Sequence, residues 1–267
     1  MTNIQSVVAI LKKASLMGAF FLLLSCHSSA STLFCSINNV PAEHAVEYVV
    51  DGDTLRLHDQ RRVRLIGIDA PEMGGRGRSA EPFAVQATRR LTELVKVNHN
   101  QVGLQVGEQS HDRYGRVLAH LYDRHGLSLE EQLIADGLAY HVVIAPNIAL
   151  ADCLAQAEQS ARERQVGLWK TARFTPADKL NKGGFTLLQG RIKHVERNKG
   201  GVWLDLGHSV TINIPLSALQ YFQGVNFEQW QGRRLKSRGW ISERKGQPKR
   251  HAKWRLTVSH PSMLELQ

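Results

Sequence analysis

Apolar and polar positions alternate through much of this chain, which is the pattern of strands with one face on a core. From Val46 to Ile68 the alternation predicts a strand, a turn and a second strand. Apolar residues at helical spacing follow in residues 80–97. The same patterns predict strands at 102–106 and 117–122, and helices at 129–135 and 150–166 that end near Gly137 and Gly167. Strands first and helices interleaved later indicate an α+β domain over residues 46–169.

The last third of the chain alternates again and predicts a second, mostly β domain over residues 185–267. Its five strands are expected at 186–195, 202–206, 210–214, 235–242 and 254–259, with a short helix at 216–222. This order is that of an OB-fold barrel, although a small SH3-like barrel has a similar pattern. Residues 170–184 are polar, contain Pro176 and Gly183-Gly184, and predict a linker between the two domains.

The first 26 residues predict a signal peptide. Lys12 and Lys13 precede an apolar run from Ala14 to Ser25, which is too short to span a bilayer. The sequence Leu-Leu-Ser-Cys ending at Cys26 resembles a bacterial lipobox, in which the cysteine is lipidated, whereas cleavage after Ala30 would release a secreted protein. We therefore expect export, with a lipid anchor at Cys26 on the periplasmic side of the cell envelope favoured over secretion, and an arm at 27–45.

Cysteine usage fits an exported protein. Without Cys26, the chain retains Cys35 and Cys153, an even number that predicts one disulfide in an oxidising compartment. The alternative is that Cys153 is a small buried thiol on its helix.

Charge is distributed unevenly along the chain, whose formal net charge is +10. Residues 185–267 carry 14 Lys and Arg against 5 Asp and Glu, while residues 27–184 are close to neutral. Because Trp240 and Trp254 are interleaved with these cations, the C-terminal domain is a candidate surface for single-stranded nucleic acid. The alternatives are that the tryptophans are core and that the basic rim binds anionic lipid or envelope polymer, and nucleic acid is favoured over them.

Two acids occupy unusual places in the first predicted hairpin. In VVDGDTLRL, Asp51-Gly52 form a turn, but Asp53 has the same parity as the apolar Leu55 and Leu57. A carboxylate on the core side needs a cation or hydrogen-bond donors, since an isolated buried charge costs too much. In VRLIGIDAPE, Asp69 ends the next strand on its apolar side. The two acids are candidates for joint ligation of a hard divalent cation, and the alternative is two separate acids with their own arginine partners.

Further polar residues complete a candidate hydrolytic site. Glu72 follows Asp69, and the segment DRYGR predicts a turn at 112–115 with Arg116 opening the next strand. Together with Arg64, these are the residue types that phosphodiester hydrolysis needs, because charge builds up on the phosphorus oxygens and water must be deprotonated and aimed. Other metal sites lack support: an EF-hand starting at Asp51 would have Arg62 in place of its glutamate, and no zinc-ligand pattern is present.

Residues 46–169 resemble the staphylococcal nuclease (thermonuclease) family through the segments VVDGDTLRL, VRLIGIDAPE, DRYGR, LIADGLA and VGLW. The resemblance implies a five-stranded OB-type barrel with three helices and Ca²⁺-dependent endonuclease activity on DNA or RNA. It implies Ca²⁺ ligation by Asp53, Asp69 and the carbonyl of Ala70. By the same resemblance Glu72 is the general base or orients the attacking water, Arg64 and Arg116 bind the phosphate, and Arg113 and Tyr114 contact a terminal phosphate.

The sequence departs from the family at LAYHVVIAPN, which lacks the paired tyrosines that flank the nucleotide in the best-known member. DNA or RNA preference and end or interior cleavage stay open for that reason. Two other classes of protein also remain: a non-catalytic nucleic-acid-binding protein, and an envelope-anchored adaptor that acts through its C-terminal domain. No protein partner follows from the sequence.

Overall fold

The computed structural model describes residues 35–267 except 76, 208 and 245–251. The predicted signal peptide with Cys26 and the first part of the arm lie outside these residues. Within the described part, no helix is long and apolar enough to cross a membrane.

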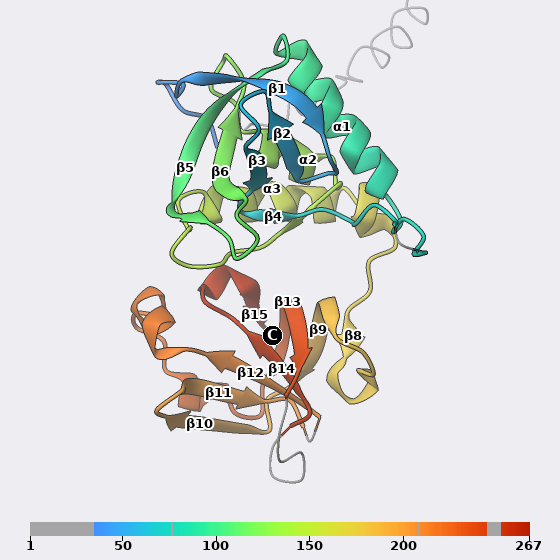
Figure 1. The fold of residues 1–267 in the computed structure, drawn as a ribbon. Coiled ribbons are helices and arrows are strands. Elements are labelled where there is room, and N and C mark those ends of the chain that lie inside the picture. The colour runs from blue at the N-terminus through green and yellow to red at the C-terminus, as the bar shows by residue number, and fades with distance from the viewer. Residues whose placement is uncertain (1–34, 76, 208, 245–251) are drawn as a thin grey trace, which may run out of the picture. The chain divides into compact units, whose positions relative to one another are not determined.

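Five strands of the first domain close into a barrel in the order β1-β2-β3-β6-β5 (Figure 1). They are β1 (Glu43–Val49), β2 (Thr54–Leu57), β3 (Arg62–Leu65), β5 (Gln101–His111) and β6 (Val117–Tyr122). Strands β3 and β6 pair in parallel and the other neighbours are antiparallel. The alternating apolar residues Leu55, Leu57, Val63 and Leu65 are fully buried inside the barrel. The predicted α+β fold with an OB-type barrel is confirmed.

Three helices pack on this barrel: α1 (Ala84–Val97), α2 (Leu129–Ala135) and α3 (Ala151–Glu163). Helix α1 covers one side and buries Ala87, Leu91 and Val95 (Figure 1). It begins later than the apolar spacing predicted, because Phe83 has φ 71°, a left-handed conformation that interrupts a helix. Strand β5 continues beyond the predicted Val106 to His111, where exposed polar residues carry no apolar alternation to reveal it.

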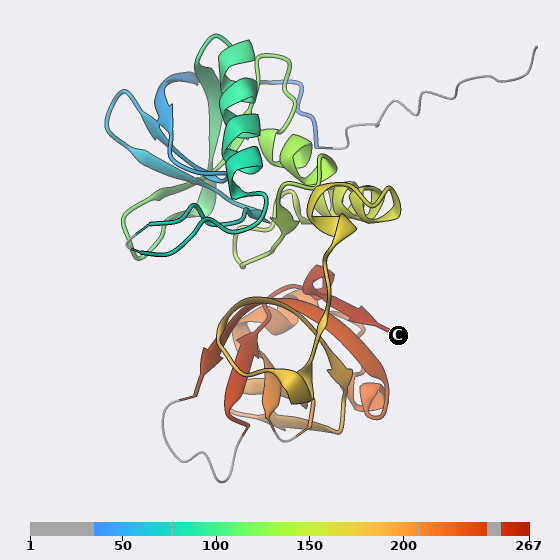
Figure 2. The same cartoon turned by 90° about the vertical axis from the view of Figure 1, so that its right-hand side faces the viewer.

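The C-terminal domain is a single eight-stranded sheet that curls around its own core (Figure 2). The strands are β8 (Thr175–Pro176), β9 (Gly184–Arg191), β10 (His194–Asn198), β11 (Gly201–Asp205), β12 (Val210–Ile214), β13 (Arg234–Glu243), β14 (Trp254–Thr257) and β15 (Leu264–Leu266). The predicted strand 186–195 divides into β9 and β10, because the buried Ile192 leaves the ladder and bonds to the carbonyl of Arg233. The predicted helix at 216–222 is a 3₁₀ helix, Leu216–Tyr221.

Part of the predicted linker, 170–184, is structured. It contains β8 and a short 3₁₀ helix, Ala177–Lys179, and β9 already begins at Gly184. The cause is packing: Ala177 is buried in the second core, and Leu180 lies against it.

The described residues form one compact unit, and the second core extends into the first domain. It includes Val142 and Val143, which follow β7 (Tyr140–His141), and Ala151 of α3. Polar contacts also cross this junction: the Ala145 amide donates to Ser259 Oγ at 2.9 Å, and Arg162 pairs with Glu265 at 3.1 Å. Helix α3 therefore contributes to both cores, since Leu154 and Ala157 belong to the first.

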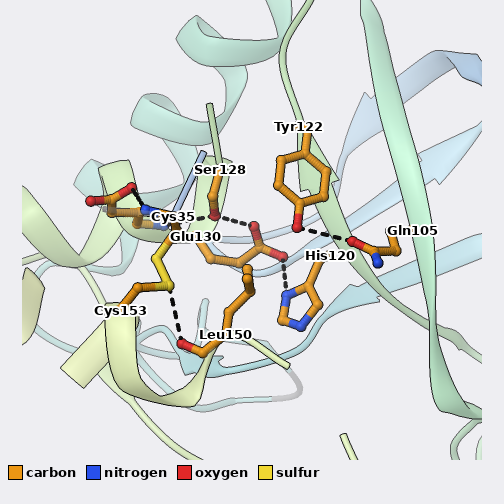
Figure 3. Close-up of a disulfide and its surroundings, with 9 residues drawn as sticks. Cys35, Gln105, His120, Tyr122, Ser128, Glu130, Leu150 and Cys153 are labelled. Atoms are coloured by element: carbon orange, nitrogen blue, oxygen red, sulfur yellow. Dashed lines mark hydrogen bonds and ion pairs between the residues drawn. A yellow bond between two sulfur atoms is a disulfide. The ribbon is translucent and has the colours of Figure 1, made fainter. Parts of the chain in front are cut away.

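A disulfide joins Cys35 to Cys153, with the two Cα atoms 5.5 Å apart (Figure 3). The bond ties the segment before β1 to α3 and closes a loop across a sequence separation of 118 residues. Next to it, the buried Glu130 accepts a hydrogen bond from Ser128 Oγ at 2.8 Å (Figure 3). It also accepts one from the Leu121 amide at 3.0 Å. The sequence left open whether Cys153 forms a disulfide or is a buried thiol, and the structure has the disulfide.

Candidate active site

The turn before β2 places Asp53 inside the protein. Asp51 accepts a hydrogen bond from the Asp53 amide at 3.1 Å, and a Cβ on Gly52 would lie 2.6 Å from the side chains of Ala70 and Ala87. Only glycine fits this close approach. Asp53 is 2% exposed, and its Oδ2 accepts a hydrogen bond from the Ala70 amide at 2.8 Å. The parity of VVDGDTLRL therefore predicted the burial of this acid correctly.

Arg64 joins the two predicted acids. Its Nη1 pairs with Asp53 Oδ1, and its Nη2 lies 3.0 Å from Asp69 Oδ1 and 3.1 Å from the carbonyl oxygen of Ile68. The acids are thus neither separate nor paired with different arginines. Asp69 is held in place because β4 (Ile68–Asp69) pairs with β7.

Burial controls the electrostatics of this cluster. It raises the pKa of the Asp53 carboxyl, and Arg64 opposes that rise. Burial also raises the pKa of Asp69 to about 6, again against the effect of Arg64. Two buried carboxylates share one guanidinium, so negative charge is left uncompensated when both are ionised.

The donor set suits a hard cation such as Ca²⁺, because it consists of carboxylate and backbone oxygen. Within the described residues, no group of three or more His, Cys, Asp or Glu side chains gathers as a metal site. A cation here would depend on Asp53, Asp69 and backbone oxygen. This donor set is the one that the resemblance implies: Asp53, Asp69 and the Ala70 carbonyl. The uncompensated negative charge of the two acids favours binding of a cation.

Glu72 lies beyond the buried acids and is exposed. Its amide donates to Glu81 Oε2 at 3.0 Å, and the Glu81 amide donates to the Glu72 carbonyl at 3.0 Å. Glu81 therefore fixes the backbone of Glu72 across the intervening loop. Sequence reasoning missed Glu81, because an acid at the start of a helical segment gives no sign of such a distant partner.

Arg116 is held by Asp112, a residue that the sequence analysis placed only in a turn. Asp112 Oδ2 accepts from Arg116 Nε at 2.7 Å, and its Oδ1 accepts from the amides of Tyr114 and Arg116, both at 2.9 Å. Burial acts to raise the pKa of Asp112, but these hydrogen bonds outweigh it and lower that pKa. The charged Asp112 thus directs the Arg116 guanidinium.

Arg113 and Tyr114 form the outer part of the site. Arg113 donates to the Tyr114 hydroxyl at 2.6 Å, and the guanidinium carbons of Arg113 and Arg116 lie 4.8 and 5.7 Å from the centre of the Tyr114 ring. Tyr114 is 67% exposed. The two arginines and the tyrosine form one cationic and aromatic cluster.

These side chains meet at one cleft of about 530 Å³. Its lining includes six of the predicted site residues: Arg64, Asp69, Glu72, Arg113, Tyr114 and Arg116. Asp53 and Ala70 are not in the lining, but Asp53 pairs with Arg64, which is, and accepts from the Ala70 amide. The cleft also includes Ile144, and Trp240 from the C-terminal domain. The sequence left Trp240 as either part of a nucleic-acid surface or core of that domain, and gave no sign of its place in this cleft.

Comparison with known proteins agrees with the fold. Residues 62–171 match the family model described as "Staphylococcal nuclease homologue". The chain is 30% identical to a thermonuclease of Staphylococcus hyicus over 128 residues, which covers 45% of this chain and 72% of that protein.

Two Bacillus subtilis proteins are similar over comparable lengths. The SPbeta prophage-derived endonuclease YokF is 32% identical over 128 residues, covering 46% of this chain and 43% of that protein. Endonuclease YncB is 29% identical over 133 residues, covering 48% and 62%. The chain thus spans only about half the length of these two relatives. With the closed barrel, the buried acids and these matches together, the chain belongs to the staphylococcal nuclease family.

Proposed function

We propose that this protein hydrolyses phosphodiester bonds of DNA or RNA, with Ca²⁺ as its cofactor. The observation that carries the proposal is the cleft, in which the exposed carboxylate of Glu72 shares one lining with Arg64, Arg113 and Arg116. Cations there match a phosphodiester, and a carboxylate beside them can accept a proton from water. The names of the relatives, endonuclease and thermonuclease, support the same reaction class.

In this reaction a water oxygen forms a bond to phosphorus, and the bond from phosphorus to one sugar oxygen breaks. Glu72 accepts a proton from the attacking water, while the leaving sugar oxygen takes a proton from solvent. Arg116, directed by Asp112, donates to the phosphate oxygens on which charge builds up. One donor matched to developing charge contributes on the order of 100- to 1,000-fold in rate.

Asp53, Asp69 and the carbonyl of Ala70 are the groups that would hold Ca²⁺. When bound, the ion supplies positive charge for phosphate oxygen and polarises water. Arg64 pairs with both acids in the structure, so a cation held by these acids would compete with the guanidinium for them, and Arg64 could then bind phosphate. Chelation of Ca²⁺ should therefore abolish cleavage while the barrel stays folded.

The test is digestion of single-stranded DNA, duplex DNA and RNA in Ca²⁺ and in chelator, beside Glu72→Gln and the exposed control Glu93→Gln. Cleavage that needs Ca²⁺, falls about 100-fold or more in Glu72→Gln and persists in Glu93→Gln supports the proposal. A folded protein that binds oligonucleotides tightly and cleaves none of them is a non-catalytic binding protein, which would overturn it.

Basic side chains of the C-terminal domain extend the proposed substrate surface. Lys193, Arg233 and Arg234 are exposed, and Lys193 and Arg234 line one further pocket of that domain. We expect the triple change to glutamine to weaken oligonucleotide binding and to flatten its salt dependence, because fewer counterions are released. If binding and its salt slope are unchanged while binding to anionic vesicles is lost, the surface binds lipid instead.

Export belongs to the proposal as well. The disulfide supports an oxidising compartment, because cytosolic reductants keep such thiols reduced. Lipidation at Cys26 can be tested by labelling cells with radioactive palmitate. If the protein is labelled and Cys26→Ala removes the label, the lipid anchor is supported. If the mature protein is unlabelled and begins after Ala30, secretion is supported.

A further inference from the structure

Trp240 is an exposed aromatic residue on the wall of the nuclease cleft. It is 43% exposed and belongs to β13 of the C-terminal domain, yet it lines the same cleft as Asp69, Glu72 and Arg116. Tryptophans usually bury most of their surface, as Trp254 of the neighbouring strand does. An open indole beside clustered arginines therefore needs an explanation.

A row of aromatic rings fixes the position of Trp240. Its ring meets Phe185 edge to face at 5.4 Å, and Phe185 stacks on Tyr140 at 5.3 Å with an interplanar angle of 25°. Trp240 and Phe185 are also directly opposed across strands β13 and β9. Tyr140 in turn pairs with Asp69 across β4 and β7. The row thus connects the buried Asp69 to the exposed Trp240 ring. Because each ring packs on the next, the position of the indole is fixed.

The junction between the domains keeps this row in place. Arg238, two positions from Trp240, is buried, pairs with Glu158 of α3 at 2.8 Å and donates to the His141 carbonyl at 2.6 Å. Val142 and Val143 belong to the core of the C-terminal domain. The indole is therefore positioned relative to the acids by packing on both sides of β13.

The chemistry of the cleft identifies what the indole binds. Of the described residues that line the cleft, Tyr114 and Trp240 are aromatic, and the ring of Tyr114 already faces Arg113 and Arg116. Trp240 is therefore the ring available to a ligand. A nucleotide places a flat base beside a phosphate, which matches an exposed indole that shares one cleft with arginines.

We propose that Trp240 stacks on an unpaired base next to the scissile phosphate, so that the C-terminal domain completes the substrate site and favours single-stranded nucleic acid. This inference rests on the proposed nuclease function. In a duplex both faces of a base are covered by its neighbours, whereas a single strand can offer one face to a side chain. Single strands and frayed ends are accordingly the preferred substrates.

The experiment uses the full chain and two single-stranded oligonucleotides that differ only at the cleavage site. One carries bases on both sides of the cleaved phosphate, and the other has tetrahydrofuran abasic analogues there. Fluorescence anisotropy gives Kd in the inactive Glu72→Gln background, and cleavage by the otherwise native enzyme gives kcat/KM. The variants are Trp240→Ala, Trp240→Phe and, as a matched control from the same domain outside the cleft, Trp203→Ala.

We expect Trp240→Ala to weaken Kd and kcat/KM about 5- to 150-fold on the base-containing strand, the range found when stacked aromatic residues are replaced by alanine. The abasic strand should show no loss, Trp240→Phe should stay within a few fold of the native protein, and Trp203→Ala should leave the difference between the strands intact. Equal losses on both strands, or no loss on either, would overturn the inference.

Two further outcomes separate this inference from the nuclease proposal. A native protein that binds but does not cleave, with the Trp240→Ala effect still confined to the base-containing strand, refutes the nuclease and supports the stacking site. Normal cleavage without any effect of Trp240 refutes the stacking site alone. If Trp240→Ala lowers the thermal midpoint, Trp240→Leu keeps apolar contact with Phe185 and answers the same question.

Discussion

Arg64 is partly buried and Arg238 is buried, and both are bonded to acids, yet their surroundings differ. Arg64 faces two buried carboxylates at the edge of an open cleft, and burial raises the pKa of both acids. Arg238 is 7% exposed and shares one buried carboxylate, Glu158, with Arg162. Acids outnumber cations at the first arginine, whereas at the second the two arginines, Arg238 and Arg162, are matched by two acids, Glu158 and Glu265. A buried charge therefore indicates a ligand site where acid is in excess beside a cleft, and structure where the charges are compensated internally.

The largest expected effect comes from the charge cluster at the junction. Changing Glu158 to Gln leaves Arg238 and Arg162 without their buried carboxylate, so we expect a loss of about 3 to 5 kcal/mol in the free energy of unfolding. Urea unfolding measures it, and Glu265→Gln, a more exposed partner of Arg162, should cost less than about 1 kcal/mol. A Glu158→Gln protein as stable as the native one would mean that this cluster is not structural.

The acids of the cleft should respond in the opposite way. Asp53→Asn removes a buried charge that is only partly compensated, so we expect kcat/KM to fall about 100-fold or more while the free energy of unfolding stays within about 1 kcal/mol. Nuclease assays and urea unfolding of the same sample test both parts. Asp59→Asn, at an exposed acid outside the cleft, is the control. Severe unfolding of Asp53→Asn would erase the distinction between the two arginines.

The disulfide tests whether covalent or ionic links hold α3. Replacing Cys35 and Cys153 together by serine should lower the free energy of unfolding by about 2 to 4 kcal/mol, because the bond restricts the unfolded chain. Reductant should destabilise the native protein by a similar amount and leave the serine variant unchanged. A native protein indifferent to reductant would show that the packing and ion pairs of α3 suffice.

The stability of the protein should also change gradually with pH. Burial first, and then the charge of Arg238, lower the pKa of His141 to about 3 from 6.5. Below pH 6.5 the unfolded chain takes up a proton that the folded protein refuses, so this stability is present above pH 6.5 and is lost as the pH falls toward 3. The loss is about 1.4 kcal/mol for each pH unit in that window.

The pH effect should be measured as a difference between the native protein and His141→Asn. The subtraction is needed because Asp53 and Asp69, whose pKa values are raised, stabilise the folded state as the pH falls. Identical pH profiles for the two proteins would contradict the assignment of a neutral histidine beside Arg238.

The local sequence pattern predicted the helices and strands, but the contact partners of the site residues depend on segments far apart in the sequence. The parity of Asp53 with Leu55 predicted its burial, because strand geometry alternates strictly. Arg64 was expected to bind phosphate, but its long side chain reaches across to both acids, a direction that parity does not determine. Asp112 was visible as a turn residue and invisible as the partner of Arg116.

The tryptophans show the same limit. Trp240 and Trp254 stand in similarly basic, alternating segments, yet one lines the cleft and the other is core. The face of a strand that is covered depends on the element that packs against it. The local sequence pattern of β13 does not reveal that the first domain lies near it. The staphylococcal nuclease motifs pointed to residues that the structure brings to one cleft, but they gave no sign that Trp240 of the second domain lines it too.

Because α3 belongs to both cores, the boundary between the two domains is not a place where the chain can be cut into independent pieces. A protease cut in the segment between Lys170 and Phe174 would divide the chain at the obvious joint. The first piece would carry the apolar side chains of Val142 and Val143 that complete the core of the second. The two pieces should therefore stay together after the cut, as a split protein whose halves reassemble only with each other.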